Sequence, residues 1–488
     1  MHRLTLVTLV MVMLVAASNG GAALAASTRF AQVQTAPTVT VLPTTATSHP
    51  WIAWAPLSNG YVEQEFRFRG MAGIYAYTSA PPPPWDLTLQ DMQPYATRML
   101  VRRPSDPAAF NGTVVVEWLN VTSGYDIDPV WGTAAQYFLR SGYAWVGVSA
   151  QAAGVEALKK WDPQRYGDLN IVDDGQSYDI FTQAAQALRQ PGSRILGDLQ
   201  IQQIIGTGVS QSAMRLVPYI NALHPLAHAY DGYFVHSRGR GMPPIQGVGV
   251  FSDQEADPIS ADVPTLVFQT EGDLMAMDYA PARQPDTDMV RTWELAGAAH
   301  VGRGAPLDLA ISAGVRARDT GFAAGPGNPA CQANPFPSWP VANAAWDHLR
   351  NWISEGTPPP SAPLIQLTHT PTIAPIPPGD TNALIARDEM GNALGGLRTP
   401  AIDAPVGAYY GTNTCNPAFL GFLSGWYVPF DAATLAKLYP THEAYVARVT
   451  ASANKAVADG FMLQEDAQRL IDEADASSIG KLGATITP

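Results

Sequence analysis

The stretch "IIGTGVSQSAMRL", residues 204–216, decides how the chain folds. An apolar run ends in Gly-Val-Ser-Gln-Ser and then passes without a loop into the spacing of a helix. Small residues at Gly208 and Ser212 leave room for backbone that passes close to a sharp strand-to-helix turn. Such a turn, a nucleophile elbow, lifts the Ser210 hydroxyl above the edge of a sheet. Because serine stands at 212 in place of glycine, an ordinary structural turn around Ser210 is the alternative.

A reactive serine needs a base and an orienting acid, because its own pKa is too high for attack at neutral pH. In folds with this elbow the acid and then the histidine follow the serine, at the ends of later strands. His300 closes "VRTWELAGAAH" and is the best placed of the nine histidines. The earlier strand "PTLVFQTEGD" offers Asp273 as the acid, with Glu271 as the alternative. One of these two acids could instead only cap the turn.

Backbone amides are the expected donors to the oxyanion that forms during attack on a carbonyl. One such amide is that of Gln211, at the start of the helix that follows the serine. The segment "VVVEWLNVTSGYD" ends an earlier strand and adds the amides of Asn120 and Val121. Asn120-Val121-Thr122 also matches a glycosylation acceptor, although a glycan there would block the site.

The chain alternates strand and helix patterns, and this alternation predicts the fold class. Apolar runs such as Val114–Val116 suit strands buried on both faces of a mainly parallel sheet. We expect an α/β core over residues 51–360, preceded by a flexible lead-in at 27–50. Residues 361–488 are expected to form a C-terminal extension with two amphipathic helices, packed on the core.

Residues 301–340 interrupt the alternation as a Gly- and Pro-rich, lid-like insertion. Long insertions at this edge of a sheet commonly wall a pocket, so the insertion, with Phe336 and Trp339, is expected to wall the substrate pocket. A surface loop that covers another face is the alternative. Cys331 and Cys415 are the two cysteines of the chain, and in an oxidising compartment they are expected to form a disulfide. Two buried free thiols are the alternative.

The first 26 residues have the pattern of an export signal. "MHR" is a short basic start, an apolar run follows, and "ALA" at 23–25 suits a signal peptidase. A membrane anchor needs a longer apolar run than one that breaks at Ser18-Asn19-Gly20. The formal charge of −13 becomes −14 without Arg3, and this acidity argues against a nucleic-acid partner. We therefore expect a secreted or periplasmic protein with no membrane span after cleavage.

Together these segments resemble the α/β-hydrolase superfamily over about residues 95–360. More closely, the chain resembles the mostly exported bacterial "α/β-hydrolase domain-containing" family. The segments that carry the resemblance are "VVVEWLNVTSGYD", "WDPQRYGDL", "SYDIFTQAAQAL", "GVSQSA", "VFQTEGD" and "WELAGAAH". The similarity continues into "GLRTPAIDAPVGAYYGTNTC" and the terminal helices. It implies an α/β-hydrolase fold, with an eight-strand-type sheet covered by helices on both faces, and acyl-transfer chemistry.

The expected function is that of an exported serine hydrolase that cleaves a small-molecule or polymeric carboxylic ester. Ser210 would attack, His300 would shuttle the proton and Asp273 would orient the imidazole, with no cofactor or metal implied. An amidase or peptidase with the same triad is the alternative enzyme. A non-catalytic binding protein on the same scaffold is the alternative outside enzymes. Acyl and alcohol preference and the oligomeric state stay open.

Overall fold

The computed structural model describes most of the chain between residues 36 and 481. The described ranges are 36–54, 57, 60–78, 86–243, 245–246, 257–302, 314–320, 332–368, 384–414 and 421–481. The expected signal segment, the Pro-rich run at 81–85 and both cysteines, Cys331 and Cys415, lie outside these ranges. Export and the disulfide therefore stay predictions.

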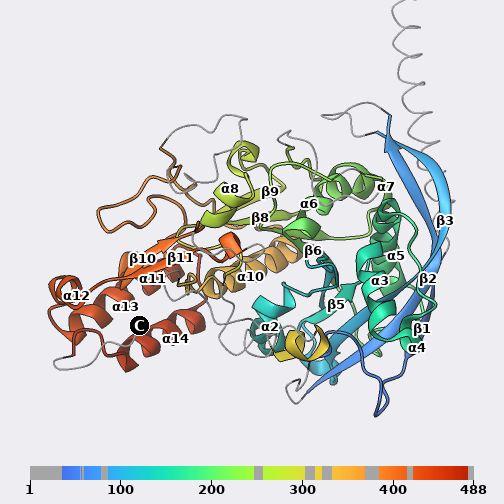
Figure 1. Cartoon of the computed structure of the whole chain (residues 1–488), viewed down its shortest axis with the longest axis horizontal. Helices are drawn as coiled ribbons and strands as arrows, with labels where there is room; N and C mark the ends of the chain where they lie inside the picture. Colours follow the sequence, from blue (N-terminus) through green and yellow to red (C-terminus); the bar gives the residue numbers. More distant parts are fainter. Residues whose placement is uncertain are drawn as a thin grey trace, which may run out of the picture.

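Nine strands of the described residues form one sheet through the middle of the molecule (Figure 1). Its order is β1-β2-β3-β5-β4-β6-β7-β8-β9. The first three strands and the β3–β5 pair are antiparallel, and every pair from β5 to β9 is parallel. The strands are β1 (Thr38–Leu42), β2 (Tyr61–Tyr77), β3 (Leu87–Pro104), β4 (Thr113–Trp118), β5 (Ala144–Val148), β6 (Gln203–Val209), β7 (Gly232–His236), β8 (Thr265–Thr270) and β9 (Val290–Leu295). The mainly parallel α/β sheet expected from the sequence is confirmed.

Helices cover both faces of the sheet. They are α2 (Trp131–Arg140), α3 (Ala152–Trp161), α4 (Pro163–Tyr166), α5 (Ser177–Arg189), α6 (Gln211–Pro218), α7 (His224–Ala227), α8 (Glu271–Ala276) and α10 (Trp339–Glu355), with the π-helical turn η3 (Tyr219–Leu223) between α6 and α7. Successive side chains of a strand point to opposite faces. Phe234 of β7 stacks on Trp346 of α10 at 4.1 Å between ring centroids, while Tyr233 packs against Tyr219 of η3. The central strands β4 and β6 are buried along their whole length.

Part of the N-terminal lead-in forms a strand, although the sequence predicted a flexible segment. Residues 38–42 form β1, which pairs antiparallel with β2 from Thr38↔Arg69 to Leu42↔Glu65. The alternation Thr-Val-Thr-Val-Leu is a strand pattern of β-branched residues. Because Thr and Pro residues surround this pattern, the strand was not recognised from the sequence. The expectation that residues 27–50 are flexible was therefore wrong for residues 38–42.

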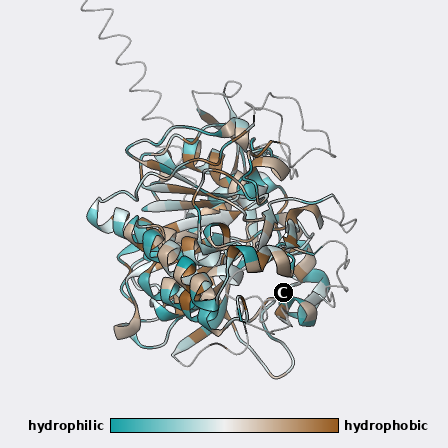
Figure 2. Cartoon of the chain, turned by 90° about the vertical axis from the view of Figure 1, so that its left-hand side faces the viewer, coloured by the Kyte–Doolittle hydropathy of each residue, from teal (hydrophilic) through white to brown (hydrophobic). Residues whose placement is uncertain are grey.

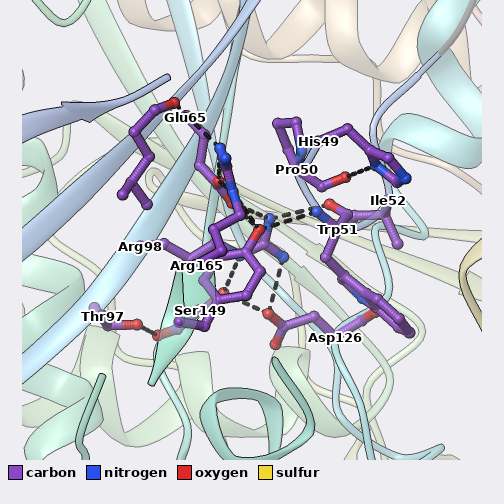
Figure 3. Close-up of polar contacts among 12 residues, drawn as sticks. His49, Pro50, Trp51, Ile52, Glu65, Thr97, Arg98, Asp126, Ser149 and Arg165 are labelled. Carbon is purple, nitrogen blue, oxygen red and sulfur yellow. Dashed lines mark hydrogen bonds and ion pairs between the residues drawn. The ribbon is translucent and has the colours of Figure 1, made fainter. Parts of the chain in front are cut away.

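A buried ion-pair network fastens the antiparallel edge to the loop that follows β4 (Figure 3). The Arg98 guanidinium of β3 lies 3.0 Å from Glu65 Oε1 and 3.1 Å from Asp126 Oδ2, and all three side chains are fully buried. Arg165 of α4 completes the arrangement, with its Nη2 2.6 Å from Glu65 Oε2. Because Asp126 belongs to the loop after β4, the network fixes the position of that loop.

The C-terminal extension lies at the end of the molecule opposite β1–β3 (Figure 1). It contains α11 (Pro400–Asp403), β10 (Gly407–Tyr410), β11 (Trp426–Pro429), α12 (Ala432–Leu438), α13 (His442–Ala458) and α14 (Gln464–Ala476). Leu397 continues the pairing of β9: its N–H donates to the Glu294 carbonyl at 2.7 Å. Phe461 packs edge-on against Trp293 of β9 at 5.0 Å. Figure 2 faces this end, where the nearest helices carry both hydrophilic and hydrophobic bands.

Phe336 and Trp339 are packed inside the protein, so the expectation that they wall a substrate pocket was wrong. Phe336 is 1% exposed and lies edge-on to Tyr409 of β10. Trp339 opens α10 and is covered by the Arg469 guanidinium of α14, 4.9 Å from its ring. The C-terminal extension supplies both partners. Residues 303–313 and 321–331 of the insertion lie outside the described residues.

Among the described residues, no helix has the length and apolar character that crossing a membrane requires.

Candidate active site

Ser210 occupies a strained turn between β6 and α6. Its φ of 59° and ψ of −118° form a backbone conformation that L residues rarely adopt. A Cβ on Gly208 would lie 2.8 Å from the Ser212 carbonyl carbon, so the turn has no room for a larger residue there. The Ser212 hydroxyl is itself held by the strand, donating to the Val209 carbonyl at 3.0 Å. This geometry is that of a nucleophile elbow.

His300 and Asp273 meet Ser210 at the carboxyl edge of the sheet. His300 Nε2 lies 3.0 Å from Ser210 Oγ, and His300 Nδ1 lies 2.5 Å from Asp273 Oδ1. The other oxygen of Asp273 accepts a hydrogen bond from the Thr270 N–H at 2.6 Å, within a capping box at the start of α8. The Asp273 side chain is fully buried and that of His300 is 5% exposed. The three side chains form one continuous hydrogen-bonded chain.

Gly272 explains how the acid and the histidine come so close. Its N–H donates to the Ala298 carbonyl at 3.0 Å, which joins the turn after β8 to the turn after β9. A Cβ at Gly272 would lie 2.6 Å from both the backbone nitrogen of His300 and the carbonyl oxygen of Gly411. The approach of the three backbone segments therefore requires glycine at this position.

Glu271, the alternative acid, has a different set of partners. Its buried carboxylate accepts from the Gly297 N–H at 2.9 Å and the Gly411 N–H at 3.0 Å, and it pairs with Arg387 at 2.7 Å. Gly411 and Arg387 belong to the C-terminal extension. Glu271 thus ties the extension to the core, while Asp273 reaches the histidine.

The three expected oxyanion donors differ in their hydrogen-bond partners. The N–H of Gln211 is the first amide of α6, and such amides lack intrahelical partners. The Val121 N–H lies 3.5 Å from Gln211 Oε1, a long contact. The Asn120 N–H instead donates to the Ile127 carbonyl at 3.1 Å, so this amide is already engaged. The Asn120 side chain donates to the Val209 carbonyl at 2.8 Å and so ties the loop to the elbow.

A buried polar relay that was not expected from the sequence supports Gln211. The Gln211 side chain donates to Gln151 Oε1 at 2.9 Å, and Trp118 Nε1 donates to the same oxygen at 3.2 Å. Gln151 in turn donates to Asp174, which pairs with Arg215 of α6 at 3.1 Å. Gln151 follows the end of β5, so its place after a buried strand was the one available signal.

His236 lies beside the site at the end of β7, but it contributes its backbone. Its carbonyl accepts from the Ser210 N–H at 3.0 Å, and its ring packs edge-on against Phe268. Burial lowers the pKa of His236 to about 4, and the neighbouring His300 adds to the shift. The ring is therefore neutral near neutral pH and serves as packing.

Comparisons with solved structures find distant similarity to esterases. A methylesterase has 12% identity, with 62% of each chain covered and a TM-score of 0.32. A glucuronoyl esterase from Solibacter usitatus has 11% identity over 53% of this chain and 80% of its own, with a TM-score of 0.28. A serine hydrolase without lid from Xanthomonas campestris has 13% identity over 47% of this chain and 92% of its own, with a TM-score of 0.27.

No curated protein matches the chain in sequence. The profile of one family, described as "Alpha/beta hydrolase domain", matches residues 34–472. The match runs from the lead-in through the elbow, Asp273 and His300 into α14. The chain belongs to the alpha/beta hydrolase domain family.

Proposed function

We propose that the protein is a serine hydrolase that cleaves carboxylic esters through an acyl-enzyme intermediate. The observation that carries this proposal is the hydrogen-bonded chain from Ser210 through His300 to Asp273. The chain begins at a serine held in a strained elbow and ends at a fully buried carboxylate. Nucleophile, base and orienting acid are thus in hydrogen-bond reach of one another, as acyl transfer by serine requires.

In the first half-reaction, His300 Nε2 takes the proton from Ser210 Oγ as that oxygen attacks the ester carbonyl. Asp273 holds the proton on His300 Nδ1 and stabilises the imidazolium that forms. The tetrahedral intermediate collapses, and the leaving alcohol receives the proton from His300. In the second half-reaction His300 takes a proton from water as the water oxygen attacks the acyl carbon. The second tetrahedral intermediate then collapses, His300 returns the proton to Ser210 Oγ, and the acid product is released.

The amides of Val121 and Gln211 would bind the developing oxyanion. In the structure the Val121 N–H faces the Gln211 side-chain oxygen at 3.5 Å, longer than a good hydrogen bond. A substrate oxygen at that position would exchange this weak contact for a charge-assisted one. Because Gln211 Oε1 now faces this N–H, the Gln211 side chain has to withdraw as the substrate oxygen enters.

We also propose that residues 1–26 direct export of the chain, on the support of their basic start, apolar run and small-residue cleavage pattern. N-terminal sequencing of the protein secreted by an expressing cell would test this. A mature start near residue 26 or 27 supports export, and an intact start in the cytoplasm contradicts it.

A paired panel of substrates tests the proposed activity. Each p-nitrophenyl ester, from acetate to octanoate, is assayed beside the p-nitroanilide of the same acyl group, with purified mature protein. We expect hydrolysis of the esters, with anilide hydrolysis slower by several powers of ten, and loss of both in Ser210→Ala. Comparable anilide rates would identify an amidase. Absence of any hydrolysis that depends on Ser210 would leave the binding-protein alternative.

A further inference from the structure

A second cluster of reactive side chains lies at the opposite edge of the sheet from Ser210. His224 and His228 bracket α7, which precedes the amino end of β7, and Asp262 precedes the amino end of β8. Ser210 and His236 follow the carboxyl ends of β6 and β7. Because these strands are parallel, their whole length separates the cluster from the proposed active site.

The ligand atoms of the cluster surround one point. The atoms that His224, His228 and Asp262 can offer to a metal all lie within 4.8 Å of one another. His224 Nε2 is 3.1 Å from Asp262 Oδ1, and His228 Nδ1 is 3.9 Å from Asp262 Oδ2. The two imidazole rings are nearly perpendicular, with their centroids 5.4 Å apart. Ligands of a tetrahedral zinc ion stand about 3.3 Å apart when the bonds are about 2.0–2.1 Å, so small movements of exposed side chains suffice.

The hydrogen bonding of His224 favours a metal ion at its Nε2 over a hydrogen bond from Nε2 to Asp262. Its Nδ1 lies 2.7 Å from the Tyr233 hydroxyl, whereas its buried Nε2 has no hydrogen-bond partner among the described residues. A proton on Nε2 would be a buried donor poorly aimed at Asp262, which is costly. When the proton is on Nδ1, this N–H donates a hydrogen bond to the Tyr233 hydroxyl, and the Nε2 lone pair points into the cluster.

Neighbouring residues hold the two sides of the cluster together. Asn221 of η3 donates to the Pro258 carbonyl at 2.9 Å and accepts from the Ser260 N–H at 2.8 Å. The His228 N–H donates to the His224 carbonyl at 2.8 Å, and a left-handed backbone at His228 turns its ring back toward His224. The segment with Asp262 and the turn with both histidines are therefore arranged without a metal.

We propose that His224, His228 and Asp262 form a binding site for a divalent transition metal ion such as Zn²⁺. Two imidazole nitrogens and one carboxylate suit zinc and its neighbours in the first transition row, whereas Ca²⁺ and Mg²⁺ prefer oxygen ligands alone. The exposed side of the cluster, where His228 and Asp262 are 64% and 49% exposed, leaves the remaining position to water. A bound metal would join the turn before β7 to the loop before β8 and stabilise the folded state, without a part in ester hydrolysis.

Binding is measured on untagged mature protein that has been stripped with a chelator. Zn²⁺ affinity and stoichiometry come from competition with a chromophoric chelator, and Co²⁺ reports coordination geometry through its visible absorption. The variants are His228→Ala and Asp262→Ala, both at exposed positions. His49→Ala is the matched control, because His49 also lies beside a carboxylate, 3.8 Å from Asp319, but outside the cluster.

We expect the wild type and His49→Ala to bind one equivalent of Zn²⁺ and to gain Tm when it is added. His228→Ala and Asp262→Ala should bind Zn²⁺ at least about tenfold more weakly and gain no Tm, since each loses one of three ligands. All four proteins should hydrolyse esters at equal rates without metal. Unchanged zinc binding in both cluster variants, or no binding by the wild type at micromolar zinc, would overturn the proposal.

Discussion

At the scale of single residues, the two acids that follow β8 have separate roles. Asp273 and Glu271 are two positions apart and both are fully buried. Asp273 contacts His300, whereas Glu271 pairs with Arg387 of the C-terminal extension. Activity and stability should therefore depend on different members of this pair.

Asp273→Asn should lower kcat for ester hydrolysis by about 10⁴-fold with little change in Tm, because the imidazole loses its orienting charge. Glu271→Gln should leave kcat of the folded protein within about threefold but lower the free energy of unfolding by about 3 kcal/mol, because it leaves the Arg387 charge without its partner. Steady-state kinetics and denaturant unfolding of both variants give the comparison. The reverse pattern would assign the orienting role to Glu271.

The sequence favoured Asp273 as the acid but left Glu271 open as the alternative. The strand ends predicted that an acid and His300 would meet Ser210, because parallel strands end at one edge of the sheet. Glu271 takes its partners from Arg387 and Gly411, which are 116 and 140 residues away along the chain. Only the folded chain shows such partners.

At the scale of elements, the loop after β4 depends on the buried network around Arg98. Arg98→Met would leave Asp126 without its charged partner, and breaking a buried pair costs about 3–5 kcal/mol. The exposed Arg194–Asp198 pair provides the control, and Arg194→Met should change stability by less than about 0.5 kcal/mol. Urea unfolding measures both. Equal stabilities of the two variants would show that the network contributes nothing.

The same variant should also affect catalysis, because this loop presents the Val121 amide. We expect Arg98→Met to lower kcat by about tenfold or more under conditions where it is fully folded, since small displacements of an oxyanion donor are costly. Arg194→Met should keep the wild-type kcat. An unchanged kcat in Arg98→Met would show that the network does not determine the position of the Val121 amide.

Elements with regular apolar patterns could be predicted, and those defined by distant contacts could not. The fully buried strands β4 and β6 follow from their apolar runs. The strand β1 was missed because its partner, β2, is needed to recognise it among Thr and Pro residues. Phe336 was assigned to a pocket because its partner Tyr409 lies far along the chain, in β10. The Gln151 relay was missed for the same reason.

At the scale of the whole molecule, the C-terminal extension is packed against the edge of the sheet that carries Ser210 and His300. The Tyr427 N–H of β11 donates to the Gln332 carbonyl at 3.0 Å, next to the position of Cys331. Thr414, which precedes Cys415, follows β10, the partner of β11. Gln332 and Thr414, the described neighbours of the two cysteines, therefore both adjoin the β10–β11 pair, in support of the disulfide that the sequence predicts.

Thiol titration of the denatured, unreduced mature protein should therefore find no free thiol, and reduction should release two. Reduction should also lower Tm, because the bridge closes a long loop in the unfolded chain. Cys331→Ala and Cys415→Ala should each match the reduced wild type in Tm. Two free thiols before reduction would contradict the disulfide.

Covalent labelling of Ser210 tests the central claim most directly. Ser212 is the matched control, because it lies two residues away but both its contacts are with the Val209 backbone. A fluorophosphonate is reacted with wild type, Ser210→Ala and Ser212→Ala, and the adduct is located by peptide mass spectrometry. The proposed triad predicts one adduct, on Ser210, in the wild type and in Ser212→Ala, and none in Ser210→Ala. Labelling of Ser210→Ala to the wild-type extent, or no adduct on Ser210 in the folded wild type, would contradict it.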